Sequence, residues 1–258
     1  MAMSRYDLTD FEWRVIEPLL PNMPRGVPRV DDRRVLNGIL WVLRSGAPWR
    51  DLPERYGPYA TCCNRFNRWC RNGIWDRLMD AIVDACDGNI QMIDSSGIRV
   101  HQHAAGFKKG GPDRCMGRSR GGLTTRIHAA VDAHGLPLRF ALSPGRRHDS
   151  QAARILLEDR LPPDSFVPGD KAYDAEWIRA TIEAREAVAI IPDRSTANAR
   201  HAFSPALYRL RNRVERFFNK LKHFRRIATR YEKLAANFLA MIKIATIRLW
   251  LRFYESTT

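Results

Sequence analysis

The stretch Tyr208–Lys222 reads YRLRNRVERFFNKLK and divides into three stripes when it is drawn as a helix with 3.6 residues per turn. Tyr208, Arg211, Glu215 and Lys222 share one face of that helix. The neighbouring stripe is apolar and suits a protein core; it consists of Leu207, Leu210, Val214, Phe217, Phe218, Leu221 and Phe224. The third stripe is basic and is expected to face solvent; it consists of Arg209, Arg213, Arg216 and Lys220.

Glu215 is therefore a lone carboxylate at the edge of a core, with cations on either side. A half-buried acid needs a cation, a metal ion or a proton beside it, because burial penalises its charged form. The helix thus predicts that Glu215 has such a partner.

The charge of the whole chain indicates a polyanionic partner. The 258 residues carry 43 Lys and Arg against 28 Asp and Glu, a formal net charge of +15. The excess is clustered, since residues 194–233 hold twelve Lys and Arg and only two acids. Nucleic acid is the partner that such a balance favours. A generically basic protein is the alternative.

The N-terminal part predicts an all-helical domain. Apolar periodicity and capping residues indicate helices from Thr9 or Asp10 to Leu20, from Asp31 or Asp32 to Gly46, and over 61–71 and 75–86. The second helix, a short turn and the third helix resemble a helix-turn-helix. The third helix is expected to point its polar residues outward; these are Asn64, Arg65, Arg68 and Arg71. A helical bundle with a solvated basic face is the alternative.

From about residue 88 the pattern changes to strands and helices in the order βββαβαβα. A three-strand meander followed by βα units predicts a mixed α/β sheet with helices on its faces. His101–Gly122 has no periodicity and is rich in Gly, Lys and Arg, so it is expected to be a loop or linker.

Three acids occupy positions at which this sheet would bring them together. Asp94 lies in the first strand, Asp170 ends the fourth, and Glu215 lies on the helix after the fifth. Three close carboxylates need a cation to stay ionised. Oxygen ligands without His or Cys favour Mg²⁺ or Mn²⁺, and a pair of such ions supports phosphoryl transfer.

Several motifs together are similar to one known family. They are MIDSSGIRVHQHAAG, SRGGLTTRIHAAVDAHG, PGRRHDSQAA, DKAYDAEWIR and the helix pattern Tyr-x2-Arg-x3-Glu-x6-Lys. On these residues the chain resembles bacterial insertion-sequence transposases of the DDE type, closest to the family of insertion sequences numbered five. The resemblance covers nearly the whole chain. It implies a ribonuclease-H-like catalytic domain with a mixed five-stranded sheet, in which Asp94, Asp170 and Glu215 are the metal-binding triad.

The resemblance also implies how the chain would handle DNA. Residues 1–86 would bind the terminal inverted repeats of an element, and residues 87–258 would cut DNA and transfer the strand to a target. Tyr208, Arg211 and Lys222 would hold DNA phosphates near the cut. Because two ends must be cut together, a homo-oligomer on DNA is expected.

Other polar residues have simpler interpretations beside the functional ones. Lys171 contacts DNA or braces Asp170, and His148 is a candidate DNA or metal-site contact. Asp149 is expected to cap a helix, and Asp132 to be a turn residue. Arg211 and Lys222 have the alternative role of pairing with Glu215 along the helix.

The sequence also indicates a cellular location and leaves rival functions open. Five cysteines without zinc spacing are expected to be reduced, and no apolar run is long enough for a membrane. A cytoplasmic protein that joins the bacterial nucleoid when it binds DNA is therefore expected. The rivals are a structure-specific nuclease of the same fold, a decayed copy that only binds DNA, and an unrelated basic helix-turn-helix regulator.

Overall fold

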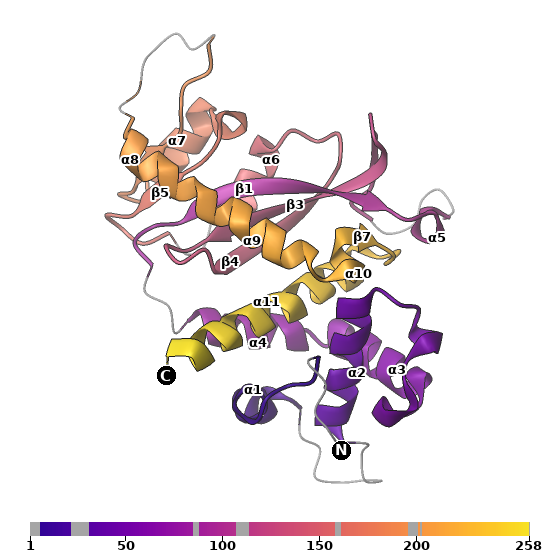
Figure 1. Cartoon of the computed structure of the whole chain (residues 1–258). Coiled ribbons are helices and arrows are strands. Elements are labelled where there is room, and N and C mark those ends of the chain that lie inside the picture. The colour runs from indigo at the N-terminus through magenta and orange to yellow at the C-terminus, as the bar shows by residue number, and fades with distance from the viewer. Residues whose placement is uncertain are drawn as a thin grey trace. The chain divides into compact units, whose positions relative to one another are not determined.

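The computed structural model describes residues 6–21, 31–84, 88–106, 114–157, 161–195, 201 and 203–257 (Figure 1). The chain divides into two compact units. Unit 1 joins Met1–Ala85 with Leu221–Thr258, and unit 2 is Cys86–Lys220. The sequence assigned the C-terminal helices to residues 87–258, whereas the structure groups them with the N-terminal helices. The expected boundary at 86–87 and part of the expected loop, 107–113, lie outside the described residues.

Unit 1 is helical, as expected. Its elements are α1 (Asp10–Ile16), η1 (Glu17–Leu19), α2 (Asp32–Ser45), η2 (Trp49–Asp51), η3 (Glu54–Tyr56), α3 (Tyr59–Arg71), α4 (Ile74–Val83), α10 (Arg225–Ala228), β7 (Thr229–Arg230) and α11 (Ala235–Thr257). Thr9 caps α1 in a capping box, in which its hydroxyl accepts from the backbone of Glu12 and Glu12 accepts from the backbone of Thr9. Asp31 caps α2, and Gly46 ends it with a φ of 75°.

Aromatic side chains form much of the core of unit 1. Trp69 and Trp75 are buried and meet edge to face with 5.4 Å between ring centroids. Phe66 lies between Trp49 and Trp75, at 5.7 Å and 6.4 Å from them. The long helix α11 supplies a further row of buried residues, because its apolar side chains cover most of its circumference.

Unit 2 is a sheet with helices on both faces. Its elements are β1 (Met92–Val100), α5 (Gln102–Ala105), β2 (Gly117–Ser119), β3 (Gly122–Val131), β4 (Pro137–Pro144), α6 (Ser150–Leu157), β5 (Phe166–Pro168), η4 (Lys171–Tyr173), α7 (Glu176–Glu183), β6 (Val188–Ile190), α8 (Pro205–Tyr208), η5 (Arg209–Arg211) and α9 (Asn212–Lys222). The last two residues of α9 belong to unit 1.

The strands run in the order β4-β3-β1-β5-β6. β3 pairs antiparallel with both β1 and β4, and β5 pairs parallel with β6. Two isolated parallel bridges, Ile90 with Phe166 and Ile93 with Gly169, attach β5 to β1. β2 forms a hairpin with the start of β3. The predicted mixed sheet with flanking helices is thus confirmed, but β5 and β6 form a two-stranded sheet of their own, which only the isolated bridges attach to β1.

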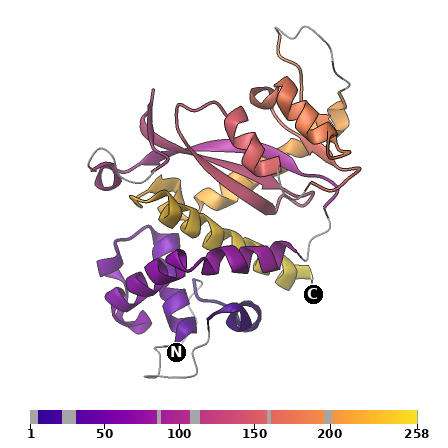
Figure 2. The same cartoon turned by 180° about the vertical axis from the view of Figure 1, so that it is seen from behind.

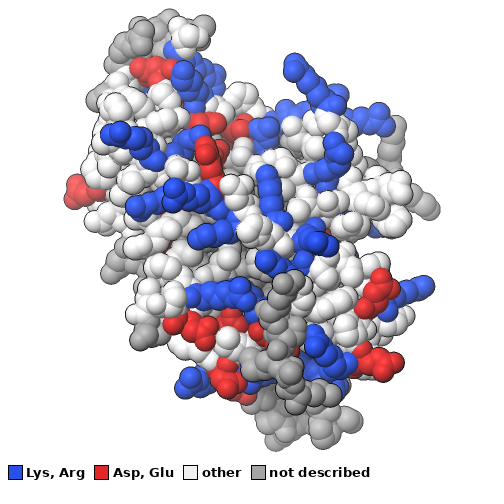
Figure 3. Space-filling model, in the orientation of Figure 1, with Lys and Arg blue, Asp and Glu red and all other residues white. Residues whose placement is uncertain are grey.

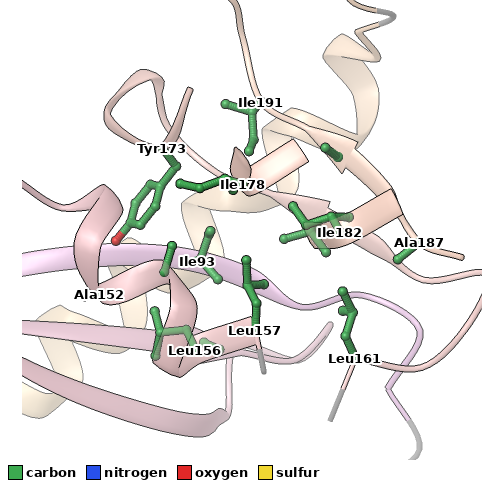
Figure 4. Packing of buried hydrophobic residues seen from close by; sticks show 14 of the residues in the cluster. Ile93, Ala152, Leu156, Leu157, Leu161, Tyr173, Ile178, Ile182, Ala187 and Ile191 are labelled. Atoms are coloured by element: carbon green, nitrogen blue, oxygen red, sulfur yellow. The ribbon is translucent and has the colours of Figure 1, made fainter. Parts of the chain in front are cut away.

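Helices cover this sheet on both sides. Figure 1 shows α9 across one face, and the reverse view in Figure 2 shows α6 and α7 on the other. Ile93 of β1 lies in the middle of the cluster beneath α6 and α7, with Leu156, Leu157, Ile178 and Ile182 around it (Figure 4). The apolar stripe predicted for α9 faces the sheet, and the Phe217 ring lies 6.0 Å from that of Phe140 in β4.

The helix that opened the sequence analysis is not a single uniform helix. Tyr208 ends α8, and the next three residues, Arg209–Arg211, form a 3₁₀ turn before α9 begins. The predicted apolar residues Val214, Phe217, Phe218 and Leu221 are buried. The predicted basic stripe is exposed throughout; it comprises Arg209, Arg213, Arg216 and Lys220.

Candidate active site

Asp94 lies in β1, and Asp170 follows the end of the neighbouring strand β5, at the N-cap of η4. The parallel bridge joins Ile93 to Gly169, and each of these residues is followed directly by one of the two acids. Paired residues of parallel strands point to the same face, so the two carboxylates lie beside each other. The pairing of β5 with β1 therefore places Asp170, although the two acids are 76 residues apart in the sequence.

Gly169 permits the close approach of these strands. A Cβ atom at this position would lie 3.2 Å from Cγ1 of Ile93 and 3.3 Å from Cγ1 of Ile191. Those contacts are tighter than ordinary van der Waals packing, so a side chain here would press β5 away from the strands on either side. The glycine thus supports the position of Asp170, whose carboxylate accepts the backbone N–H of Ala172 at 2.8 Å.

Arg211 connects the third acid to the first. Its Nη1 lies 2.6 Å from Oδ2 of Asp94, and its Nη2 lies 2.6 Å from Oε1 of Glu215. The second contact spans one helical turn, and the first joins η5 to β1. One guanidinium therefore holds two carboxylates from distant parts of the chain.

Burial is the main cause of the unusual electrostatics of Asp94. The pKa of Asp94 is raised to about 6, chiefly by burial and to a smaller extent by the nearby Asp170 and Glu215 carboxylates. The backbone N–H of Ser95 and the guanidinium of Arg211 act in the opposite direction without cancelling this effect. Burial alone would lower the pKa of Arg211, but Asp94 and Glu215 raise it above its ordinary value.

The face that carries this site is basic. Figure 3 shows a small group of acidic side chains among many Lys and Arg on the side on which α8 and α9 lie. The basic stripe of α9 contributes to this surface, because all four of its members are exposed. A phosphate backbone approaching the acids would thus meet positive charge first.

The three acids fit a divalent cation by their chemistry. They offer only oxygen donors, the kind that Mg²⁺ and Mn²⁺ take, and the raised pKa of Asp94 indicates that a further cation would be favourable. Within the described ranges, no three or more His, Cys, Asp or Glu side chains already form an arrangement that could hold a metal ion. Arg211 occupies one oxygen each of Asp94 and Glu215.

A buried polar network supports β1 immediately beside Asp94. The hydroxyl of Ser95 donates to Oδ2 of Asp149 at 3.0 Å, and Arg126 forms an ion pair with the same carboxylate. Tyr173 of η4 is buried beside these groups, and burial raises the pKa of its hydroxyl well above the ordinary value. The network therefore ties β1, β3, α6 and η4 together at the level of the acids.

His128 extends that network. Its Nε2 lies 2.8 Å from Oγ of Ser143, and its Nδ1 lies 3.5 Å from the hydroxyl of Tyr173. The pKa of His128 is lowered to about 4, chiefly by burial; Asp149 opposes this effect, and Arg126 adds to it. The imidazole is therefore neutral at pH 7.

Sequence reasoning missed these supporting residues. Asp149 directly precedes α6, where it was expected to cap the helix, and its buried side chain pairs with Ser95 and Arg126. No local sequence pattern indicates such a role, because the partners of Asp149 lie in β1 and β3, which are distant in the sequence. The one signal in the sequence that could have suggested this contact is that the motifs around Asp94 and Asp149 both contain an acid, so that the two could have been considered together. Asp132 does form the expected turn, since its carboxylate accepts from the backbone of His134 and Leu136.

The remaining predicted contacts are distributed as follows. Tyr208 is partly buried, with the Arg211 guanidinium 5.8 Å from its ring centroid. Lys171 and His148 are exposed in unit 2, and His148 Nδ1 lies 3.0 Å from Ser150 Oγ. Lys222, Arg68 and Arg71 are exposed in unit 1. The pairing of Arg211 with Glu215, an alternative from the sequence, is present.

The outward orientation predicted for Arg65 is wrong. Arg65 is only 6% exposed, forms an ion pair with Asp32 and lies with its guanidinium 5.4 Å from the Trp69 ring centroid. The acid at the start of α2 draws it inward, because an ion pair and an aromatic face compensate the burial of a guanidinium.

Two family models cover most of the chain. The model described as "Putative transposase of IS4/5 family" matches residues 8–79, and the model described as "Transposase DDE domain" matches residues 86–250. The chain belongs to the DDE transposase family. All three candidate acids of this transposase lie within the second match.

Curated relatives agree with the family. The transposase is 41% identical over 131 residues to a putative transposase for insertion sequence element IS6501 of Brucella ovis, a match of 50% of this chain and 100% of the relative. It is 36% identical over 128 residues to an uncharacterized protein, y4sN, of Sinorhizobium fredii, over 49% of this chain and 95% of the relative.

Among solved structures, the transposase matches the Mos1 transposase paired-end complex with left transposon end. The sequence identity is 12% and the TM-score 0.26, over 79% of this chain and 82% of that chain. A similarity of that size carries no structural argument. Across the described residues of the transposase, no helix is both long and apolar enough to cross a membrane.

We predict that His128 makes the transposase less stable in mild acid. The unfolded chain takes up a proton near pH 6.5, whereas the folded chain does so only near pH 4, so stability falls as the pH drops between these values. The free energy of unfolding should fall by up to about 3 kcal/mol from this group. Urea denaturation of wild type and His128→Gln from pH 7 to 4 measures the difference.

The exposed His148 provides the control for that series. His148→Gln should follow the wild-type pH dependence, because this side chain is exposed and its replacement leaves the buried network around His128 intact. If the free energy of unfolding fell with pH equally in wild type and His128→Gln, His128 would not be the cause of the loss of stability in acid.

Proposed function

We propose that this protein is an active DNA transposase whose catalytic acids are Asp94, Asp170 and Glu215. The observation that carries the proposal is that Arg211 bridges Asp94 and Glu215. In addition, the bridge between Ile93 and Gly169 supports a position of Asp170 next to Asp94. Acids held together at this proximity, on a basic face, suit chemistry on a phosphodiester. The alternative is a structure-specific nuclease of the same fold, which would cut DNA without joining it.

The acids would hold two Mg²⁺ or Mn²⁺ ions. When bound, such ions supply charge stabilisation for the attacking and leaving oxygens of a phosphodiester. Arg211 keeps the carboxylates of Asp94 and Glu215 together beforehand, and it is then available to form a fork with a DNA phosphate. Tyr208 would donate one hydrogen bond to the backbone, and Lys222 would provide a point charge.

The N-terminal helices would bind the element ends, with residues 1–86 as the DNA-binding domain and 87–258 as the catalytic one. Arg68 and Arg71 are exposed on α3 and would meet phosphates or base edges, whereas the buried Arg65 would support that helix from inside. Lys171 and His148 are exposed in the catalytic unit and would contact DNA there. A homo-oligomer would hold two element ends together in the bacterial cytoplasm.

We predict Mg²⁺-dependent strand transfer. A labelled element-end duplex incubated with a supercoiled target plasmid should give a joined product in Mg²⁺ and none in EDTA. Asp170→Ala should abolish joining, because it removes a proposed metal ligand. Glu183→Ala, an exposed acid of α7, should retain it.

The same assay separates the rivals. Cutting without joining would favour the nuclease. Binding without cutting, in a wild-type protein that is folded and saturated with Mg²⁺, would favour a copy that only binds DNA. Asp94→Asn should lose cutting while it keeps DNA affinity, since the basic surface is unchanged. A loss of affinity in that folded variant would mean that the site is misplaced.

A direct prediction concerns metal binding without DNA. Mg²⁺ at about a hundred times its dissociation constant should stabilise the protein by roughly 2.7 kcal/mol, which a rise in melting temperature measures. Asp94→Asn should lose most of this rise, and Glu54→Gln, which changes an exposed acid of unit 1, should keep it. An equal rise in all three proteins would place the ion elsewhere.

We also predict that Arg68 contacts a DNA phosphate. Arg68→Gln should reduce the slope of log affinity against log salt concentration by about one unit, because one fewer counterion is released. Arg14→Gln, which alters an exposed arginine of α1, should leave the slope unchanged. An unaltered slope in Arg68→Gln would assign that side chain to a solvated face.

A further inference from the structure

Four exposed arginines lie at one end of the sheet in unit 2, and none of them belongs to the site described above. Arg118 is the middle residue of β2, and Arg120 lies in the turn between β2 and β3. Arg146 and Arg147 lie in the turn between β4 and α6. These four residues are called the basic rim below. Figure 3 shows Lys and Arg side chains gathered on the side of unit 2 away from α8.

The two turns of the basic rim are packed against each other. β2 lies in line with β4 along the same edge of β3. A Cβ atom on Gly117 would lie 3.0 Å from Cβ of Pro144 and 3.1 Å from the backbone nitrogen of Gly145, so a side chain here would push the turns apart. Nε of Arg146 donates to the backbone carbonyl of Arg118, which joins the turns directly. The rim is therefore a braced surface rather than two separate loops.

Acids among the described residues do not compensate the charge of the rim. Asp149, the acid that follows the rim in the chain, is buried and forms its ion pair with Arg126. None of the four rim arginines forms an ion pair with an acid whose position the structure describes. Four guanidiniums that face solvent in this way attract a polyanion, and each can form a fork with a phosphate group.

The register of the sheet relates the rim to the proposed catalytic acids. Arg118 pairs with Leu123 of β3. Asp94 pairs with Ala129 of the same strand. Directly paired residues share a face of a sheet, and so do residues an even number apart along one strand. Because Leu123 and Ala129 are six residues apart, Arg118 lies on the face that carries Asp94. The distance between them along the strand is roughly 20 Å, at about 3.3 Å per residue.

This separation can be expressed in base pairs of DNA. Each strand of a duplex places one phosphate about every 3.4 Å along the axis, so roughly 20 Å corresponds to about six base pairs. A duplex with one phosphodiester at Asp94 and with its axis along the strands of the sheet would bring its backbone to the basic rim at that distance.

We propose that the basic rim binds the backbone of the same DNA duplex that is cut at the acids, about six base pairs from the cut. The proposal rests on the proposed function, because the position on the DNA is counted from Asp94. It adds a second contact in the catalytic unit that reads no sequence and holds the duplex in register with the acids. A braced surface suits this task, because it loses little freedom when it binds.

The salt dependence of DNA binding tests the rim without any cutting. The full chain binds an element-end duplex that extends roughly twelve base pairs on each side of the cut, twice the proposed span, in EDTA. Arg118→Gln should reduce the slope of log affinity against log salt concentration by about one unit, and the double variant Arg118→Gln/Arg120→Gln by about two. Arg118→Lys should keep the wild-type slope, because a lysine still neutralises one phosphate.

Arg185→Gln is the matched control. Arg185 is an exposed arginine between α7 and β6 in the same unit, and α7 covers the opposite face of the sheet (Figure 2). Its replacement removes the same charge from the chain and should leave the slope unchanged. Melting temperatures equal to that of wild type verify that the variants are folded.

Shortened duplexes locate the contact on the DNA. The element-end duplex is shortened stepwise, separately on each side of the cut. On one side, wild-type affinity should fall once fewer than about six base pairs remain, and below that length Arg118→Gln should bind as tightly as wild type. Shortening on the other side should leave the difference between wild type and Arg118→Gln unchanged.

The contrary results separate this inference from the proposed function. An unchanged slope in both folded rim variants would overturn the inference and leave the catalytic assignment intact. A difference that no shortening removes would overturn the proposed position. Reduced joining to a target plasmid with unchanged binding of the element end would also overturn the inference, because the rim would then bind the target duplex. Absence of DNA binding by wild type would contradict the proposed function, and the inference with it.

Discussion

The contact on which the site depends is the guanidinium of Arg211 between Asp94 and Glu215. Without a cation, a buried carboxylate beside two others would be protonated or pushed apart from them. Arg211 satisfies one oxygen of each partner at 2.6 Å and thereby fixes η5 and the start of α9 against β1. The pKa of Asp94 is still raised to about 6, chiefly by burial, so Arg211 does not fully offset the cost of keeping this carboxylate charged. A metal ion at the proposed site would add the further positive charge that favours the ionised acids.

The sheet provides the second constraint. Asp170 lies beside Asp94 only because β5 is attached to β1 through the bridge of Ile93 with Gly169. The apolar side chains beneath α6 and α7 hold that attachment from one face, and the aromatic residues of α9 press on the other. Beside Asp94, Asp149 anchors Ser95, so the backbone that carries the acid is fixed on both sides. Rigid strands with supported neighbours are what a precise active site requires.

The sequence predicted what local patterns and charge determine. Hydrophobic periodicity predicted the order of the longer strands and helices, but it missed α5 and β2, which lie within the expected loop 101–122. The positions of Asp94, Asp170 and Glu215 suggested one site. Long-range partners were not readable, because nothing near Asp149 specifies Ser95 and Arg126 as its contacts. The attachment of α11 to the N-terminal helices was missed for the same reason. Arg65 turned inward because Asp32, distant in sequence, is its partner.

A crystal structure of the full chain with Mn²⁺ tests the central claim most directly, because anomalous scattering locates the metal without reference to activity. The account predicts Mn²⁺ at about 2.0–2.2 Å from carboxylate oxygens of Asp94 and Asp170, with Arg211 withdrawn from at least one of its two acids. Manganese bound elsewhere, with Arg211 still bridging Asp94 and Glu215, would contradict the claim that these acids form the metal site.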